Sequence, residues 1–265
     1  MKKLLFILFL VGIFTSCEEV VDIDLNDAPP RLVVQANLSI WQDGTASATV
    51  KLTTTAPYFD NNIPFVSDAI VIVTDENGEQ FPFNYQVDGI YVTNLIPQPN
   101  LNYTLKIIYK NEIYSATEKL YTVAPLEYVE QRNDGGFSGE DIELKVFYTD
   151  PGGENNFYFF EGLSERGNDI DVSSDEFYNG NLFFEYYLVE DLAPGDEVQF
   201  NIYGISQAYY NFMFVLLQQT GGGGGPFETQ PATVRGNVIN ETSTENFPLG
   251  YFRISEVSKL NYTVQ

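Results

Sequence analysis

Apolar residues recur at every second position from Arg31 onwards, and this alternation restricts the fold more than any other feature of the chain. Leu32, Val34, Ala36 and Leu38 alternate with mostly polar neighbours. Successive side chains of a β-strand point to opposite faces, so the spacing places one apolar row on a single face of a strand. The same pattern continues over residues 46–55 with Thr and Val. We therefore expect the first half of the chain to consist of strands.

Residues 69–121 carry the signals of a β-sandwich. A β-branched run over residues 69–74 leads to Asn77-Gly78, a dipeptide favoured in tight hairpin turns. Pro82 in the returning strand predicts an edge position, because proline lacks the backbone donor that a central strand needs. Tyr103 is the candidate for the tyrosine whose hydroxyl bonds back to the preceding corner in immunoglobulin-like domains. We expect an N-terminal immunoglobulin-like β-sandwich over residues 31–124.

Residues 125–265 predict a second β-rich domain that carries one α-helix, so the fold class is mainly all-β. Helical spacing of Tyr209, Phe212 and Met213 predicts a helix over residues 207–219, with Ser206 as its N-cap. Its apolar stripe is expected to pack in the core rather than to form a binding groove. Strands are expected over residues 141–148, 156–163, 182–188 and 197–205, and near 232–239, 249–254 and 259–264.

The first seventeen residues indicate where the protein resides. Lys2 and Lys3 precede an apolar run over residues 4–14, which is too short to span a bilayer and is typical of a secretory signal. The run ends at Thr15-Ser16-Cys17, which resembles a bacterial lipobox, so we expect a signal peptide over residues 1–16 and lipid attachment at Cys17. A secretion signal followed by an incidental cysteine is the alternative.

The acidic segment that follows is expected to be a tether over residues 17–30. Fully extended, residues 18–30 would hold the first domain at most about 45 Å from a membrane. Its acidic residues resemble the surface-export signals of Bacteroidota lipoproteins, and a merely solvated leader is the alternative.

The composition excludes several classes of function. The chain has no histidine, one cysteine and a net charge of −24. Zinc, haem, copper and iron–sulfur sites of the usual ligand types are therefore excluded, as are Ser-His-Asp and Cys-His nucleophiles. We expect no cofactor, no nucleic-acid partner and no enzymatic activity. Only a carboxylate-dependent glycan hydrolase stays open as an enzymatic alternative.

Three local patterns are candidates for binding. The loop over residues 149–158 contains Asp150, Glu154 and Asn155, whose oxygens could bind calcium, although an Asp-capped Pro-Gly turn is the favoured interpretation. A second acidic cluster is expected to be a solvated loop; it comprises Asp169, Asp171, Asp175 and Glu176. A row of aromatic residues could form a platform for a ligand or partner, with core packing as the default for each one; it comprises Phe183, Phe184, Tyr186 and Tyr187. No metal site is assigned.

A series of short motifs in a specific order resembles the Bacteroidota lipoproteins of the family called domain of unknown function 4249 (DUF4249). The motifs run from Cys17 and Leu32-Val33-Val34 through Thr149-Asp150-Pro151, Asn156-Phe157-Tyr158, Pro194-Gly195-Asp196, the 209–219 helix and Pro226-Phe227 to Gly236-Asn237-Val238 and Leu249-Gly250-Tyr251-Phe252. The resemblance implies an outer-membrane lipoprotein, often encoded beside a TonB-dependent transporter, with no established enzymatic activity. The residues 221–225 depart from the pattern.

Together these features predict a non-enzymatic lipoprotein that is anchored in the outer membrane through Cys17 and exposed on the cell surface. We expect it to act as an accessory or substrate-binding partner of a TonB-dependent transporter. A freestanding adhesin or glycan-binding lipoprotein is the alternative.

Overall fold

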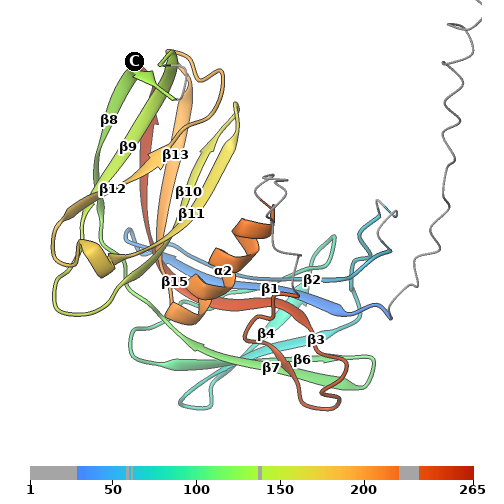
Figure 1. Ribbon diagram of the computed structural model, residues 1–265. Helices are drawn as coiled ribbons and strands as arrows, with labels where there is room; N and C mark the ends of the chain where they lie inside the picture. The colour runs from blue at the N-terminus through green and yellow to red at the C-terminus, as the bar shows by residue number, and fades with distance from the viewer. Residues whose placement is uncertain (1–28, 58–59, 61, 137–138, 221–232) are drawn as a thin grey trace, which may run out of the picture.

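The computed structural model describes residues 29–57, 60, 62–136, 139–220 and 233–265. Among these residues, two β-sandwiches form two arms that meet at an angle, and one long helix lies in the crook between them (Figure 1). The signal peptide, Cys17 and most of the acidic tether fall outside the described residues. Within the described residues, no helix has the length and apolar character needed to cross a bilayer.

The first arm is built around the alternating strand that the sequence predicts. The inward residues of β1 (Leu32–Trp41) are buried, and they include Leu32, Val34, Ala36 and Leu38. The arm also contains β2 (Ala46–Thr54), β3 (Ile70–Asp75), β4 (Gln80–Tyr85), β5 (Ile90–Thr93), β6 (Asn102–Tyr109) and β7 (Glu112–Lys119). Residues from both layers share one apolar core. The immunoglobulin-like sandwich predicted from the sequence is confirmed.

The corner tyrosine has the predicted contact. The hydroxyl of Tyr103 accepts a hydrogen bond from the backbone N–H of Gln98 at 2.8 Å, five residues upstream. Its ring is buried in the core of the first arm. The bond satisfies the polar end of an otherwise buried side chain and fixes the corner before β6.

The hairpin between β3 and β4 forms where Asn77-Gly78 predicts it. The backbone N–H of Gly78 donates to the carbonyl of Asp75, and Gly78 has a φ of +87° that favours glycine. The carboxylate of Asp75 also accepts hydrogen bonds from the backbone N–H groups of Asn77 and Glu79.

The edge position predicted from Pro82 is wrong for the strand as a whole, because β4 lies between β3 and β5 in the strand order. β4 pairs with β3 through Phe83 and with β5 only from Asn84 onwards. Pro82 itself therefore has a ladder partner on one side alone, which is why its missing donor is tolerated. The sheet bends at β4, so its strands form two layers.

The second arm is also a sandwich. One layer contains β10 (Phe157–Ser164), β11 (Asn168–Ser174) and β13 (Glu197–Gly204), and the other contains β8 (Leu126–Gly135), β9 (Asp141–Thr149) and β12 (Leu182–Tyr187). Four strands expected from the sequence are present to within about one residue. The strands β8 and β11 were missed because their alternation includes many charged residues. The cluster that contains Asp169 and Asp171 is therefore part of a strand, not of a loop.

One strand belongs to both arms. In β15 (Leu249–Thr263), residues 249–257 pair with β1 in parallel, and residues 257–263 pair with β13 in antiparallel fashion. The sequence predicts two short strands here, near 249–254 and 259–264, and the structure has one continuous strand instead. The polar residues between them, Ser255 and Ser258, are buried within the ladder.

The division of the chain into two domains, residues 31–124 and 125–265, stays a prediction. The shared strand belongs to the second range but also pairs with a strand of the first. The short strand β14 (Ile239–Asn240) pairs with β7, and Val238 packs in the core of the first arm. Residues that we assigned to the second range therefore complete the first sandwich. The C-terminal segment returns to the first arm, where β15 pairs with the edge of β1 that faces away from β2.

The helix α2 (Gln207–Thr220) confirms the helix predicted over residues 207–219. Its N-terminus is capped as expected, because the backbone N–H of Tyr209 donates to the hydroxyl of Ser206 at 3.1 Å. The helix contacts β10 and β11, and its side chains reach Tyr251 on β15. It therefore covers the face of the sheet that the two arms share.

Candidate functional site

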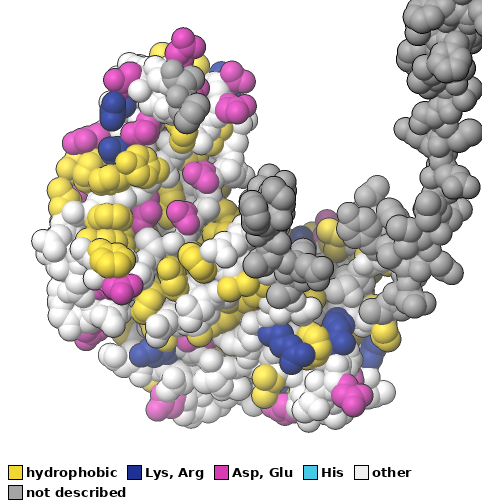
Figure 2. Space-filling view, in the orientation of Figure 1, with side chains coloured by type: hydrophobic (Ala, Val, Ile, Leu, Met, Phe, Trp, Pro, Cys, Tyr) yellow, Lys and Arg dark blue, Asp and Glu magenta, His cyan; other side chains and the backbone are white. Residues whose placement is uncertain are grey.

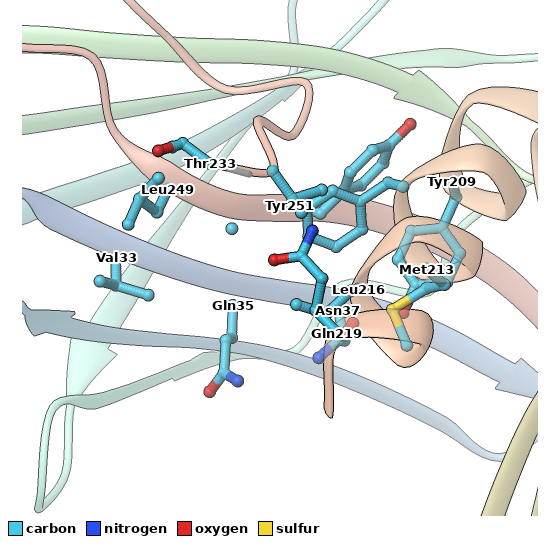
Figure 3. A pocket seen from close by; sticks show the side chains of 13 residues that line it. Val33, Gln35, Asn37, Tyr209, Met213, Leu216, Gln219, Thr233, Leu249 and Tyr251 are labelled. Carbon is cyan, nitrogen blue, oxygen red and sulfur yellow. The ribbon is translucent and has the colours of Figure 1, made fainter. Parts of the chain in front are cut away.

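The principal candidate site is a groove of about 630 Å³ that lies in the crook between the arms. Strand β1, strand β15 and helix α2 form most of its surface (Figure 3). Its lining consists of Val33, Gln35, Asn37, Tyr209, Phe212, Met213, Leu216, Gln219, Thr233, Val234, Leu249, Gly250 and Tyr251. No charged side chain is among them, in a chain whose net charge is −24.

Strand alternation decides what β1 presents to the groove. Because Leu32, Val34 and Ala36 point into the core, Val33, Gln35 and Asn37 point outwards on the opposite face. Gln35 and Asn37 make no side-chain hydrogen bond within the described part of the chain, and neither does Gln219 at the far end of α2. Each free amide offers both donors and an acceptor to a ligand.

Aromatic rings form the wall where α2 meets β15. The rings of Tyr209 and Tyr251 meet edge-on at 4.9 Å, and that of Phe212 lies 5.2 Å from Tyr251. Tyr209 and Met213 are buried, whereas Phe212 and Leu216 are only partly buried. The helix stripe therefore packs in the core, as predicted, but its border also lines the groove, which the sequence did not predict.

The rim of the groove depends on two glycines from the motifs described above. Gly250 has a φ of +92°, and a Cβ there would lie 1.9 Å from the carbonyl oxygen of Val34. A Cβ on Gly236 would lie 1.6 Å from the carbonyl oxygen of Gly250. The side chain of Asn237 binds both the N–H and the carbonyl of Phe252 at 2.8 Å. These motif residues join the segment before β14 to β15.

A buried cation lies beside the groove. Arg253 is directly across from Asn37 in the β1–β15 ladder, and 7% of its surface is exposed. Its guanidinium stacks on the rings of Tyr203, Phe159 and Tyr209, at 4.4, 5.1 and 5.2 Å from their centres. Nε and Nη1 have no hydrogen-bond partner in the described part of the protein. Such a cation is held by aromatic faces rather than by a carboxylate.

The calcium interpretation of the loop at residues 149–158 finds no support in its geometry. One oxygen of Asp150 accepts from the hydroxyl of Tyr158 at 2.5 Å, and the other accepts from the backbone N–H of Gly180 at 2.9 Å. Asp150 is buried, while Glu154 and Asn155 are exposed. Among the described residues, no group of three or more acidic side chains is arranged to bind a metal ion. Asp150 instead ties its loop to the segment that precedes β12.

The second acidic cluster is dispersed rather than gathered. Asp175 is buried and accepts a hydrogen bond from the side chain of Asn179 at 2.6 Å, whereas Glu176 is exposed. Asp169 and Asp171 lie on β11. The structure does not bring these four carboxylates to one site.

The aromatic row on β12 divides between the two faces of the sheet. Tyr187 is buried in the core, and Phe183 stacks on Tyr178 with ring centres 3.7 Å apart. Phe184 and Tyr186 point outwards, and the ring of Phe184 continues a ladder through Phe147 and Tyr128 on the neighbouring strands. The rings of Tyr128 and Phe147 stack face to face at 4.6 Å, whereas those of Phe184 and Tyr186 are nearly perpendicular, at 89°, so the outward rings do not form one flat platform.

A buried carboxylate occurs on the inward face of β12. Both Tyr148 and Ser173 donate hydrogen bonds to Oε1 of Glu185, at 3.0 and 2.5 Å. Burial raises the pKa of Glu185 to about 7, and the negative charge of Asp171 adds to the effect. The site is enclosed within the second arm, so we assign it to stability rather than to binding.

Sequence reasoning missed the groove residues Gln35, Asn37 and Tyr251, and the buried Arg253 beside the groove. The polar positions of an alternating strand indicate only that they face away from the core, which usually means solvent. The signal that could have found them is the arginine within the apolar start of the last strand, since a buried cation needs a specific environment.

Comparisons with known proteins found one family and several similar solved structures. The chain matches the family described as Domain of unknown function (DUF4249) over residues 18–261. No match was found among curated proteins. One similar solved structure is a segment of two fibronectin type III domains from chicken tenascin. That match has 14% identity and a TM-score of 0.23, and it covers 66% of this chain and 91% of that one. Another is a chain of a cytokine receptor complex, with 12% identity, a TM-score of 0.26, and coverage of 68% and 86%.

The family match extends over most of the chain and includes both arms. The resemblance inferred from the order of the sequence motifs is thereby confirmed at the level of the family. The protein belongs to the DUF4249 family.

Proposed function

We propose that this protein is a non-enzymatic binding lipoprotein, anchored in the outer membrane through Cys17 and exposed on the cell surface of a member of the Bacteroidota. We further propose that it acts as an accessory or substrate-binding partner of a TonB-dependent transporter. What supports the proposal is an uncharged groove between the arms, in a chain whose first seventeen residues resemble an export and lipidation signal.

The lining of the groove supports binding rather than catalysis. It contains no Asp, Glu, Lys, Arg or Cys side chain, and its hydroxyl groups come from Thr233, Tyr209 and Tyr251. General acid–base and nucleophilic catalysis need a titratable pair within hydrogen-bond reach of the substrate. Free amides beside aromatic rings instead orient a ligand that is not transformed.

Anchoring is tested by the variant Cys17→Ala. We expect it to leave the membrane fraction, because the lipid attached at Cys17 is the proposed anchor. The control is Ser16→Ala, which keeps a small residue before the cysteine and should leave the protein membrane-bound. Retention of Cys17→Ala at the level of the native chain would contradict lipid anchoring.

The partnership is tested by purifying the full-length lipidated protein from outer membranes in mild detergent. We expect a TonB-dependent channel to copurify in a stoichiometric amount, identified by mass spectrometry. Recovery of the lipoprotein alone would refute the accessory role.

A freestanding glycan-binding lipoprotein is the second candidate. The amides of Gln35, Asn37 and Gln219 favour it, because they make no hydrogen bond to the described residues. Amides and aromatic rings together suit the hydroxyl groups and apolar faces of sugars. Glycan-array binding by a protein that copurifies with no channel would support this candidate over the first.

A further inference from the structure

Two arginines stack on one phenylalanine ring beside the groove. The guanidinium carbon of Arg31 lies 3.8 Å from the ring centre of Phe247, and that of Arg235 lies 3.6 Å from it. Two guanidinium groups at such distances cannot share one face, so they cover opposite faces of the ring. Figure 2 shows basic side chains gathered on the lower arm, in the region of the segment that leads into β15.

This arginine pair, Arg31 and Arg235, is not neutralised by the described residues. The Nη1 of Arg31 donates to the backbone carbonyls of Glu245 and Phe247, at 2.9 and 3.2 Å. Arg235 is exposed and makes no hydrogen bond to any described residue. Neither takes part in an ion pair of the described structure, which contains three such pairs elsewhere. In a chain with 37 acidic and 13 basic residues, two neighbouring cations that pair with no carboxylate of the described residues point to an external anion.

The arginine pair lies at one end of the groove. Arg31 precedes the groove residue Val33 by two positions of an extended chain, so it points to the same side about 7 Å further along. Arg235 directly follows Val234, and Phe247 precedes Leu249 by two residues. Each of these three residues therefore adjoins a residue that lines the groove. A ligand in the groove that extended past Val33 would reach both guanidinium groups.

The two regions have complementary chemistry for an amphiphile. The groove offers mainly apolar contacts, from side chains such as Phe212, Met213, Leu216 and Leu249. The arginine pair offers several N–H donors that match the oxygens of a phosphate, which has enough free oxygens to bind two guanidinium groups. We propose that the groove holds the acyl chain of a single-chain lipid and that the arginine pair binds its phosphate headgroup.

This inference rests on the proposed binding role of the groove and names the class of ligand. It concerns a single lipid molecule rather than a bilayer. A net charge of −24 repels an extended anionic surface, whereas one phosphate that contacts both guanidinium groups beside the ring of Phe247 experiences mainly the local field.

Three probes separate the contributions of head and tail. They are palmitoyl lysophosphatidate, monopalmitoylglycerol, which is the same molecule without phosphate, and glycerol 3-phosphate, which lacks the acyl chain. Binding to residues 18–265, which contain every described residue, is measured by calorimetry below the concentration at which micelles form. We expect lysophosphatidate to bind at least about tenfold more tightly than either fragment, because hydrogen bonds to a charged group and burial of an acyl chain each contribute at least on this scale.

Two variants test the two regions separately. Arg235→Gln should lower the affinity for lysophosphatidate about tenfold, or about 1.4 kcal/mol, and leave that for monopalmitoylglycerol unchanged. Its control is Arg132→Gln, an exposed arginine on β8 that pairs with Asp134. Gln35→Trp should fill the groove and weaken both acylated probes. Its control is Lys106→Trp, at an exposed position on β6 away from the groove.

Equal affinity for lysophosphatidate and monopalmitoylglycerol would overturn the inference, and so would an unchanged affinity in both Arg235→Gln and Gln35→Trp. Circular dichroism of each variant verifies that it is folded. Failure here is distinct from failure of the proposed function. Copurification of a transporter with a chain that binds no lipid would refute only the ligand class, whereas lipid binding without a copurifying channel would refute only the partnership.

Discussion

Replacing Glu185 by Gln should change how the stability of the protein depends on pH. The carboxyl group is enclosed in the second arm, accepts hydrogen bonds from Tyr148 and Ser173, and has no cationic partner among the described residues. Its pKa is about 7 in the folded state, against an ordinary value of 4.5. The unfolded chain therefore releases this proton at a lower pH than the folded protein does.

The sign of the effect follows from this difference. Because the folded-state pKa is raised, the stability associated with the protonated carboxyl is fully present below pH 4.5 and is lost as the pH rises through 7. A shift of 2.5 pH units corresponds to about 3 kcal/mol of unfolding free energy. Glutamine resembles the protonated acid in shape and does not ionise, so Glu185→Gln should match the native chain near pH 4.5.

The assay is urea unfolding followed by circular dichroism at several pH values from 5 to 8. We expect the unfolding free energy of Glu185→Gln to exceed that of the native chain by a growing margin, which approaches about 3 kcal/mol at pH 8. Glu130→Gln, at an exposed position on β8, is the matched control and should give a curve parallel to the native one. Parallel curves for Glu185→Gln, or a variant less stable at pH 8, would refute the reasoning.

Three further substitutions test other parts of the structure by the same unfolding assay. Gly250→Ala should destabilise the protein by more than about 2 kcal/mol, because its Cβ would overlap the carbonyl oxygen of Val34 and its φ is positive; a loss below 1 kcal/mol would contradict the close approach. Arg253→Met should leave the unfolding free energy unchanged or raise it by about 1 kcal/mol, since it removes two buried donors that have no acceptor among the described residues. A marked loss would show that the contacts of the guanidinium with the aromatic rings outweigh the cost of burying its charge. Tyr103→Phe should lower the unfolding free energy by about 1 kcal/mol, because the hydrogen bond from Gln98 is lost. An unchanged unfolding free energy would show that this bond does not stabilise the protein.

The backbone packing at the rim of the groove gives a structural role to the motifs that contain Gly236-Asn237 and Gly250. Gly236 and Asn237 face Gly250 and Phe252 across the segment that closes the first arm. These residues do not present reactive groups. They fix the backbone at the rim of the groove, where a side chain larger than hydrogen would collide with a carbonyl group.

The sequence by itself determined the strands whose alternation is regular, the helix and its cap, and the corner tyrosine. These features depend on residues close together in the chain. The ten residues of β1 are enough to show which of its faces is apolar, and Ser206 caps the helix by accepting a hydrogen bond from Tyr209, three residues later. The lipidation signal at Cys17 is local in the same sense, and it stays a prediction.

Only the tertiary structure decided which strands meet. No local pattern indicates that β15 leaves one sandwich and enters the other, because pairing between β1 and β15 joins residues more than two hundred positions apart. The groove, the arginine pair and the buried Arg253 all result from that pairing. Hydrogen bonds between distant strands are specified by the sum of many side-chain contacts across both arms, so the site exists only once the whole chain has folded.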